Sequence, residues 1–346
     1  MTHGLTLGKY APLHAGHQRV METALAEMGR VTVIIYDCPE TTAVPLNVRA
    51  DWLRDLYPTV NVVEAWDGPV EVGDTPAIRR RHESYVLNDL GLRDVTHFYS
   101  SEFYGDHMSR ALGAVNRLVD PARTQTPISS TLIRADPYRW RRFVPGRVYR
   151  DLITNVVFLG APSTGKTTLA AALARELDTV WMPEYGREYW EAHQRDRRLT
   201  PAQLVELAEG HLAREEARLG EANGTLFTDT NALTTAVFGH FYHGRIEPRL
   251  AELARLAERR YDLVFVCDTD IPYDDTWDRS GPGNRAVFQK RVLAELQSRR
   301  VPYLLLSGEL AQRNERVKGV LAVYQKYGNL TDNLVAAQAV LAGGHS

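Results

Sequence analysis

The sequence predicts an α/β protein made of two doubly wound parallel-sheet domains. Short apolar strands alternate with amphipathic helices along the chain, which is typical of parallel sheets covered by helices. The length of 346 residues fits two domains of about 100–200 residues each. Each half opens with a strand, a glycine-containing loop and a helix, so we predict domains at residues 1–150 and 151–346.

The first half begins with a strand at Leu5–Leu7, a loop from Gly8 to Ala15 and a helix with apolar residues at helical spacing. A β-branched strand at Val31–Tyr36 completes a βαβ unit. A stretch rich in arginine, proline and tryptophan, Asp136–Val148, interrupts the alternation before the second half. Between the βαβ unit and this stretch we expect two helices, at Val48–Tyr57 and His82–Leu90, and two strands, at Val60–Glu64 and Thr96–Ser100.

The second half starts with a strand at Asn155–Leu159 that leads through a loop into a helix. The charged stretch 206–221 is predicted to be a solvated helix face with i,i+4 ion pairs. Further strands are expected at Thr179–Met182, Thr225–Thr228, Leu263–Cys267 and Tyr303–Leu306. Helices are expected at Pro201–Gly220, Arg249–Arg260, Arg285–Arg300 and Gln312–Tyr327.

Composition excludes several classes of protein. The 41 Lys+Arg and 43 Asp+Glu residues leave a formal net charge of −2 with no segregation along the chain, so nucleic acid is not an expected partner. No apolar run approaches the ~18–20 residues of a membrane span, and no secretory leader is recognisable, so we expect a cytoplasmic protein without a membrane partner. Cys38 and Cys267 are far apart in apolar strand-like runs and are predicted to be buried, reduced thiols.

The second half carries a nucleotide-binding pattern between its first strand and the following helix. Residues 160–168 fit G-x-x-x-x-G-K-[ST], in which backbone N–H groups and the helix N-terminus surround phosphates. Lys166 is expected to neutralise the β- and γ-phosphate oxygens, and the Thr167 hydroxyl to hold Mg²⁺. The segment comprises Gly160, Ala161, Pro162, Ser163, Thr164, Gly165, Lys166, Thr167 and Thr168, and it predicts an ATP site.

Two polar segments follow at the ends of the next strands, where a doubly wound sheet presents its ligand groups. The segment EYGREY carries Glu184, Tyr185 and Arg187; it either grips the hydroxyls and ring of a small acceptor or forms an ordinary helix N-terminal turn. Asp229 is either an acid for Mg²⁺ or its water, or an N-cap aspartate.

The glycine-rich segment 277–285 is either a lid that delivers an arginine to the transferring phosphoryl group or a plain surface loop. Its two arginines are Arg279 and Arg285. No N-K-x-D base-reading pattern occurs, which disfavours a GTPase. The combination favours a small-molecule kinase.

The first half carries a histidine-containing loop, GKYAPLHAGH, between strand and helix. His14 and His17 could form a metal pair, but no third ligand lies nearby in sequence. Gly16 allows a phosphate to approach the helix start closely, where the two imidazoles and Lys9 would bind and charge-stabilise it. A second segment, ISSTLIR at 128–134, taken alone is a helix N-cap followed by a surface arginine.

These motifs together resemble the NadR-type bifunctional proteins. GKYAPLHAGH and ISSTLIR are followed in order by GAPSTGKTT, EYGREY, TDTNALTT and DRSG, over nearly the whole chain. Such proteins join a nicotinamide-mononucleotide adenylyltransferase of the HxGH nucleotidylyltransferase superfamily to a P-loop ribosylnicotinamide kinase. Some members also carry an N-terminal helix-turn-helix; this sequence begins at the first transferase strand, so DNA binding is not expected.

The resemblance implies roles for individual residues. In adenylyl transfer it implies contacts to ATP from Gly8, Lys9, Tyr10, His14, His17, Ser129, Ser130, Thr131 and Arg134. In the kinase it implies Lys166 and Thr167 at ATP·Mg²⁺, Glu184, Tyr185 and Arg187 near the riboside, Asp229 at the metal or the acceptor hydroxyl, and Arg279 in the lid. Trp66 is a weak candidate for stacking on nicotinamide, with a core or surface tryptophan as the alternative.

The implied reactions form a sequence. The kinase would phosphorylate the 5′-hydroxyl of nicotinamide riboside, and the resulting mononucleotide would attack the ATP α-phosphorus to give NAD and pyrophosphate. The attacking phosphate is already ionised at pH 7, so positioning and charge stabilisation should suffice. The expected partners are therefore ATP, nicotinamide riboside, nicotinamide mononucleotide and NAD, with homo-oligomerisation left open. The alternative is that one site turns over while the other is a ligand-sensing regulatory module.

Overall fold

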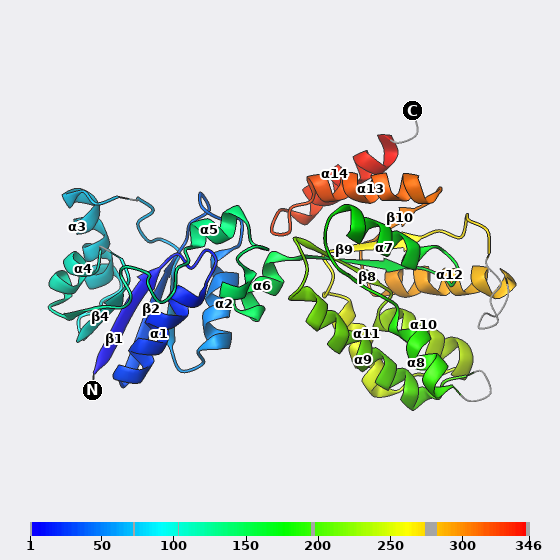
Figure 1. Ribbon diagram of the computed structural model, residues 1–346, viewed down its shortest axis with the longest axis horizontal. Helices are drawn as coiled ribbons and strands as arrows, with labels where there is room; N and C mark the ends of the chain where they lie inside the picture. Colours follow the sequence, from blue (N-terminus) through cyan, green and yellow to red (C-terminus); the bar gives the residue numbers. More distant parts are fainter. Residues whose placement is uncertain (1, 72, 103, 195–197, 274–281, 344–346) are drawn as a thin grey trace. The chain divides into compact units, whose positions relative to one another are not determined.

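The computed structural model describes residues 2–71, 73–102, 104–194, 198–273 and 282–343. The chain forms two compact units, Met1–Tyr149 and Arg150–Ser346 (Figure 1). Each unit contains one five-stranded sheet in which all paired strands run parallel. The predicted α/β class with two parallel-sheet domains is therefore confirmed.

The sheet of the first unit has the strand order β3-β2-β1-β4-β5. Its strands are β1 (His3–Gly8), β2 (Arg30–Tyr36), β3 (Asn61–Ala65), β4 (His97–Ser100) and β5 (Val115–Leu118). The connecting helices are α1 (Ala15–Glu27), α2 (Leu46–Leu56), α3 (Pro76–Ser84), which a π-helical turn Tyr85–Asp89 continues, and α4 (Gly105–Leu112). The strand order reverses at β1, and the crevice at such a switch point is where open α/β sheets bind ligands.

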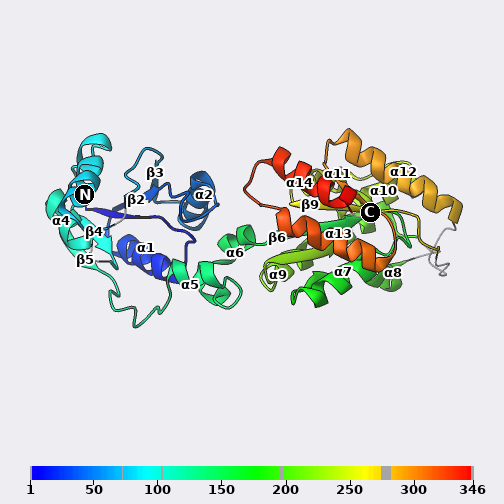
Figure 2. The same cartoon turned by 90° about the horizontal axis from the view of Figure 1, so that it is seen from above.

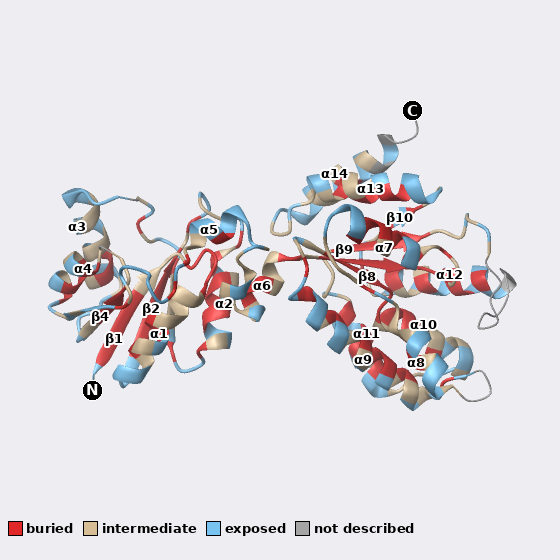
Figure 3. Ribbon diagram, viewed as in Figure 1, coloured by how far each residue is buried: buried red, intermediate tan, exposed pale blue. Residues whose placement is uncertain are grey.

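The chain leaves β5 through a long connection to α5 (Ser130–Ala135), a 3₁₀ turn at Arg141–Phe143 and α6 (Gly146–Leu152), and the sequence boundary of the first unit falls within α6. The core of the first unit contains β-branched and aromatic strand residues such as Ile34 and Phe98. Strands of this kind are buried because helices cover both faces of a parallel sheet; Figure 3 shows the buried residues along β1 and β2.

The sheet of the second unit has the order β10-β9-β6-β8-β7. Its strands are β6 (Thr154–Leu159), β7 (Trp181–Met182), β8 (Thr225–Asp229), β9 (Leu263–Cys267) and β10 (Leu304–Leu306). Its helices are α7 (Lys166–Glu176), α8 (Tyr185–His193), α9 (Pro201–Leu219), α10 (Ala232–His243), α11 (Pro248–Ala257), α12 (Pro282–Ser298), α13 (Leu310–Val323) and α14 (Leu330–Gly343).

The central strand β6 separates two hydrophobic cores. Val156 and Phe158 pack with residues of α7, α13 and α14, whereas Val157 and Leu159 pack with residues of α8 to α12. Successive strand residues point to opposite faces, so this alternation assigns the helices to two layers. Figure 2 shows the same arrangement from above, with α7, α13 and α14 together on one side of the sheet.

Several elements differ from the sequence prediction. The helix predicted at His82–Leu90 begins earlier, at Pro76, because Thr75 caps its N-terminus and its side chain accepts a hydrogen bond from the Ile78 N–H group. The sequence prediction does not include helices α4, α10 and α14 or strand β5, and it gives α8 only as an alternative, a helix N-terminal turn. Helix α10 has apolar residues around most of its circumference. The sequence therefore shows no apolar stripe at helical spacing that would identify it. Edge strand β5 has mostly exposed residues.

Cys38 and Cys267 are both free and buried, as predicted; Cys38 lies just after β2 rather than within a strand. Among the described residues, no helix combines the length and apolar character that a membrane crossing requires.

Candidate functional sites

The phosphate loop of the second unit connects β6 to α7. It turns sharply at Gly160, whose φ of +133° is open only to glycine, and a Cβ there would lie 2.7 Å from the carbonyl oxygen of Cys267. The loop ends where α7 begins at Lys166. Strand, tight loop and helix N-terminus thus follow in the order that a phosphate site needs.

Lys166 folds back across this loop. Its side chain is buried, and Nζ donates hydrogen bonds to the carbonyl oxygens of Gly160 and Ala161 at 3.1 and 2.9 Å. The Ala161 N–H group donates to Oε1 of Gln289 in α12 at 2.8 Å. The ammonium charge is therefore held within the loop, where the motif requires it.

Two arginines donate hydrogen bonds to carbonyl oxygens of the loop. Arg285 Nη2 donates to the Ser163 carbonyl at 3.0 Å, and Arg313 Nη1 donates to the Thr164 carbonyl at 2.7 Å. Arg285 is buried inside the first turn of α12, which begins at Pro282 rather than at the predicted Arg285, and its guanidinium also donates to the carbonyl oxygen of Ile271. The lid stays a prediction, because most of segment 277–285 lies outside the described residues. Arg279, the other predicted lid arginine, lies outside the described residues.

Asp229 ends β8 and is fully buried beside the loop. Its Oδ2 accepts a hydrogen bond from the Thr167 hydroxyl, whereas its Oδ1 is buried without a partner. Burial, and secondly the negative charge of Glu184, raise the pKa of Asp229 to about 7. The residue that caps α10 is Asn231, so the N-cap alternative for Asp229 is wrong.

The oxygens of Asp229 and Thr167 fit a small divalent cation. Carboxylate and hydroxyl oxygens are ligands that Mg²⁺ accepts, and the unpartnered buried Oδ1 supplies a negative group that a cation would satisfy. The residues therefore suit the Mg²⁺ ion predicted from the motif.

A cavity of about 560 Å³ extends from the phosphate loop into the space between α8, α9 and α10. Glu184 and Arg187 line it together with loop residues from Gly160 to Thr168. The rest of its wall combines apolar and aromatic side chains such as Trp190 and Phe238 with polar ones, among them Arg198 and His211. Polar groups beside the phosphate loop and apolar or aromatic side chains further along suit a small acceptor that carries both hydroxyls and a flat ring.

Glu184 and Tyr185 play different parts at the start of α8. Glu184 occupies the N-cap position and makes no side-chain cap bond, so its carboxylate is available to the cavity. Tyr185 does not line that cavity, because its ring lies under the Arg214 guanidinium at 3.9 Å and packs against Gly210. The segment is the predicted helix N-terminal turn, and Glu184 and Arg187 also line the cavity; the grip on an acceptor stays a prediction.

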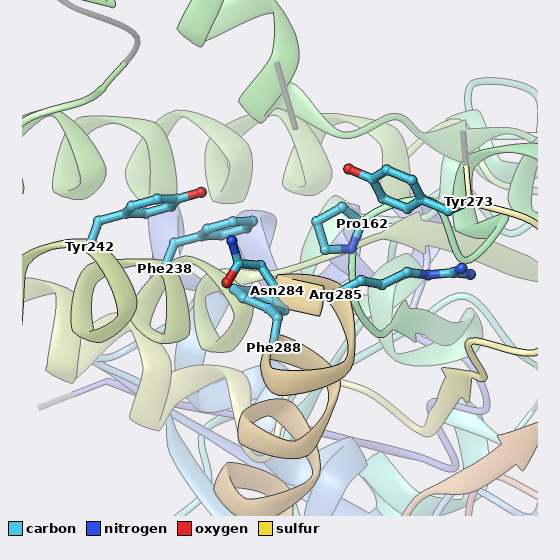
Figure 4. A pocket seen from close by; sticks show the side chains of 7 residues that line it. All are labelled: Pro162, Phe238, Tyr242, Tyr273, Asn284, Arg285 and Phe288. Carbon is cyan, nitrogen blue, oxygen red and sulfur yellow. The ribbon is translucent and has the colours of Figure 1, made fainter. Parts of the chain in front are cut away.

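A small aromatic pocket adjoins the loop at Pro162 (Figure 4). Phe238 and Tyr242 of α10 lie with their rings parallel, and Phe288 of α12 packs beside Phe238 at 4.4 Å between ring centroids. Tyr273 lies on the other side of Pro162, near the Arg285 guanidinium. These aromatic residues had no recognisable sequence motif, because they come from three separate segments.

The histidine loop of the first unit joins β1 to α1. His14 caps α1, and its Nδ1 accepts a hydrogen bond from the Gly16 N–H group at 3.0 Å. The rings of His14 and His17 stack with centroids 3.9 Å apart. His17 Nδ1 is buried without a partner.

Both histidines are neutral at pH 7. Burial, and then the charge of Arg123, lower the pKa of His14 to about 4. Burial, followed by the charges of His14 and Arg123, lowers the pKa of His17 well below its ordinary value. The expectation that two imidazoles supply positive charge is therefore corrected: they offer hydrogen bonds, and Arg123, which no motif singled out, supplies charge nearby.

Lys9 and the buried Arg49 organise the start of this loop. Lys9 Nζ pairs with Glu40 at 2.6 Å and donates to the Thr41 hydroxyl at 3.2 Å. Arg49 is fully buried and donates to the carbonyl oxygens of Lys9, Tyr36 and Val44. Sequence reasoning missed Arg49 because its only signal was an arginine on the apolar side of a predicted helix.

The two predicted motifs of the first unit meet in space. Ser130 Oγ donates to the Pro12 carbonyl at 3.1 Å, and Arg134 donates to the Ala11 carbonyl and to the Thr131 hydroxyl. Ser129 caps α5 through its side chain. Residues 129–134 thus hold the histidine loop.

The other predicted residues of this site lie at its margin. Tyr10 is buried with its ring 4.8 Å from that of His17, and Gly8 ends β1. Trp66 follows β3, is 58% exposed and donates to Glu64, so its stacking role stays a prediction. No group of three His, Cys, Asp or Glu side chains suited to a metal occurs among the described residues.

Comparisons with known proteins agree with this arrangement. An AAA domain family model matches residues 155–313. The trifunctional NAD biosynthesis/regulator protein NadR of Escherichia coli (strain K12) is 26% identical over 336 residues, covering 89% of this chain and 79% of that protein. A crystal structure of NadR protein in complex with NAD and AMP-PNP has a TM-score of 0.52 and 22% identity, covering 98% of this chain and 96% of that one. A NadR structure in complex with NR has a TM-score of 0.52 and 23% identity over 99% and 95%. The predicted resemblance to NadR-type proteins is confirmed over nearly the whole chain, and the structural similarity confirms the fold.

Proposed function

We propose, from this similarity to NadR proteins, that the chain is a bifunctional enzyme of NAD salvage. The second unit would phosphorylate nicotinamide riboside with ATP to give nicotinamide mononucleotide. The first unit would transfer the adenylyl group of ATP to that mononucleotide, giving NAD and pyrophosphate. The observation that supports the proposal is that each unit has a loop joining the carboxyl end of a central strand to a helix N-terminus, the arrangement that suits a phosphate.

The kinase reaction depends on positioning and on charge. Lys166 and the N–H groups of the loop would bind the transferring phosphates, while the riboside would occupy the cavity lined by Glu184 and Arg187. Glu184, free of capping bonds, would orient the 5′-hydroxyl and accept its proton. Thr167 and Asp229 would hold Mg²⁺, which when bound neutralises negative charge on the phosphate oxygens.

The adenylyl transfer needs no base, because the attacking phosphate is already ionised. The N-terminus of α1 provides N–H groups and a positive dipole end at His14 and Gly16. The neutral imidazoles of His14 and His17 would donate hydrogen bonds to phosphate oxygens, with Arg134 nearby on α5. Lys9 would exchange its bond to Glu40 for the phosphates.

The test is incubation of the purified protein with ATP, Mg²⁺ and nicotinamide riboside, with nucleotides resolved by chromatography. Successive appearance of mononucleotide and NAD is expected. If no mononucleotide forms from the riboside, the kinase assignment is wrong. If mononucleotide accumulates and added mononucleotide yields no NAD, the first unit is not an adenylyltransferase under these conditions, and the alternative of a ligand-sensing module is favoured.

A further inference from the structure

A buried histidine borders the acceptor end of the cavity. His211 lies in α9 and is only 4% exposed. It lines the cavity together with Glu184 and Thr230. Its Nε2 is buried without a hydrogen-bond partner. An unpaired polar atom in the interior costs free energy, so a group that persists in this state needs a reason.

His211 and Glu184 line the same cavity, and the helices α8 and α9 that carry them approach closely at Gly210. A Cβ at Gly210 would lie 2.6 Å from a ring carbon of Tyr185, so only glycine allows this contact. Tyr185 follows Glu184, and Gly210 precedes His211. The two residues next to this contact, Glu184 and His211, thus lie on adjoining helices that both line the cavity.

A second carboxylate lies behind the imidazole. Glu215 Oε2 is 3.9 Å from His211 Nε2, and Glu215 is completely buried. Three groups fix Glu215: Arg260 Nε at 2.7 Å, the Tyr261 hydroxyl at 2.8 Å and Asn155 Nδ2 at 3.0 Å. The position of Glu215 is thus set by the fold.

The stretch 206–221 is therefore more than the solvated face predicted from the sequence. Glu216 pairs with Arg150 and Arg260 rather than with a residue of its own helix, and Glu215 points inward. The ion pairs of this part of α9 are mostly tertiary contacts.

We propose that His211 is a positioning residue that takes up the proton released in phosphoryl transfer, working through Glu184. In the step, the oxygen of the acceptor hydroxyl forms a bond to the γ-phosphorus, and the bond from that phosphorus to the bridging oxygen breaks with its electron pair leaving on ADP. The hydroxyl proton passes to the Glu184 carboxylate and then to Nε2 of His211, the ring nitrogen that has no partner. The resulting imidazolium faces the Glu215 carboxylate. The arrangement of carboxylate, imidazole and carboxylate follows the general logic of an acid–base pair oriented by a third group.

The groups that face His211 fit this role. Burial, the largest influence on the pKa of His211, and the charge of Arg260 oppose its protonated form, whereas Glu215, Glu184 and a hydrogen bond to the backbone of Thr230 favour it. The net effect lowers the pKa of His211, so the imidazole is neutral and able to accept a proton at pH 7.

The test compares His211→Gln with wild type in riboside phosphorylation at saturating ATP and Mg²⁺, from pH 5 to 9. Glutamine retains polarity and similar length but cannot take up a proton. We expect kcat to fall roughly 10²-fold, the lower range for loss of an acid–base group, with little change in KM for the riboside. The ionisation that His211 contributes to the acidic limb of the wild-type pH profile should also be lost, while that of Asp229 remains. His240→Gln is the matched control, because His240 is an exposed histidine of α10 that does not line the cavity, and its profile should match wild type.

An unchanged rate and pH profile in folded His211→Gln would overturn the inference. If that variant does not fold, the wild-type profile decides: without an ionisation below pH 6.5 in kcat, His211 does not accept the proton. The inference rests on the proposed kinase function, but the two fail differently. A wild-type protein that does not phosphorylate the riboside contradicts the function, whereas an active wild type with an unaffected variant contradicts only the role of His211.

Discussion

Replacing His14 by glutamine should make the first unit less sensitive to acid. The pKa of His14 is lowered from 6.5 to about 4, so the folded unit excludes a proton that the unfolded chain binds. The free energy of unfolding is therefore unaffected by this group above pH 6.5 and decreases as the pH falls from 6.5 toward 4. At about 1.4 kcal/mol per pKa unit, His14 accounts for about 2 kcal/mol of the stability lost between pH 7.5 and pH 5.

Two buried cysteines allow this loss to be measured in each unit separately. Cys38 lies in the first unit and Cys267 in the second. Urea unfolding at pH 7.5 and pH 5, followed by labelling with 4,4′-dithiodipyridine and mass spectrometry of each cysteine peptide, gives two unfolding curves. In His14→Gln the pH-dependent loss reported by Cys38 should shrink by about 2 kcal/mol, while the curve reported by Cys267 should not change. An equal loss in variant and wild type at Cys38 would show that His14 is not held neutral by burial.

Four further outcomes follow from the two sites. Lys166→Ala should abolish phosphorylation of the riboside while leaving NAD synthesis from supplied mononucleotide, and a folded variant that lost both activities would show that the sites are not independent. His17→Ala should slow adenylyl transfer by about 10²-fold, the scale of removing one preorganised hydrogen-bond donor, with riboside phosphorylation little changed in the same preparation. Raising Mg²⁺ should partly restore kinase activity in Asp229→Asn but not in Glu184→Gln, and rescue confined to the latter would reverse the two roles. Gly160→Ala should remove kinase activity and lower the stability of the second unit by about 1–3 kcal/mol through its backbone conformation alone, measured as urea unfolding at Cys267; an intact unit with normal kinase activity would contradict the close contact.

The sequence predicts the parts of the fold that have a simple period. Strands β2, β6 and β9 are runs of β-branched and apolar residues, and each was located within a residue or two. Helix α10 and edge strand β5 were missed because one is buried around most of its surface and the other is mostly exposed, so neither shows a one-sided pattern.

Local motifs predict the phosphate loops, whereas contacts between distant segments are not readable from one sequence. The GKT and HAGH segments define their own geometry through glycine, a helix N-terminus and a few polar side chains. In contrast, Arg49, Arg313 and Glu215 become recognisable only when the fold brings their carbonyl or ionic partners to them. In sequence, each is one charged residue in a predicted helix.

The hydrogen bonds that the loop carbonyls accept from Lys166, Arg285 and Arg313 also influence how the loop N–H groups would attract an anion. Four consecutive or nearly consecutive carbonyls, those of Gly160, Ala161, Ser163 and Thr164, accept hydrogen bonds from Lys166, Arg285 or Arg313. A cation on a carbonyl oxygen draws electron density through the peptide unit and leaves the N–H group of the next residue more positive. The arginine contacts to Ser163 and Thr164 therefore act on the N–H groups of Thr164 and Gly165, and in the proposed ATP site part of the attraction for phosphate would come from guanidinium groups on the far side of these peptide units.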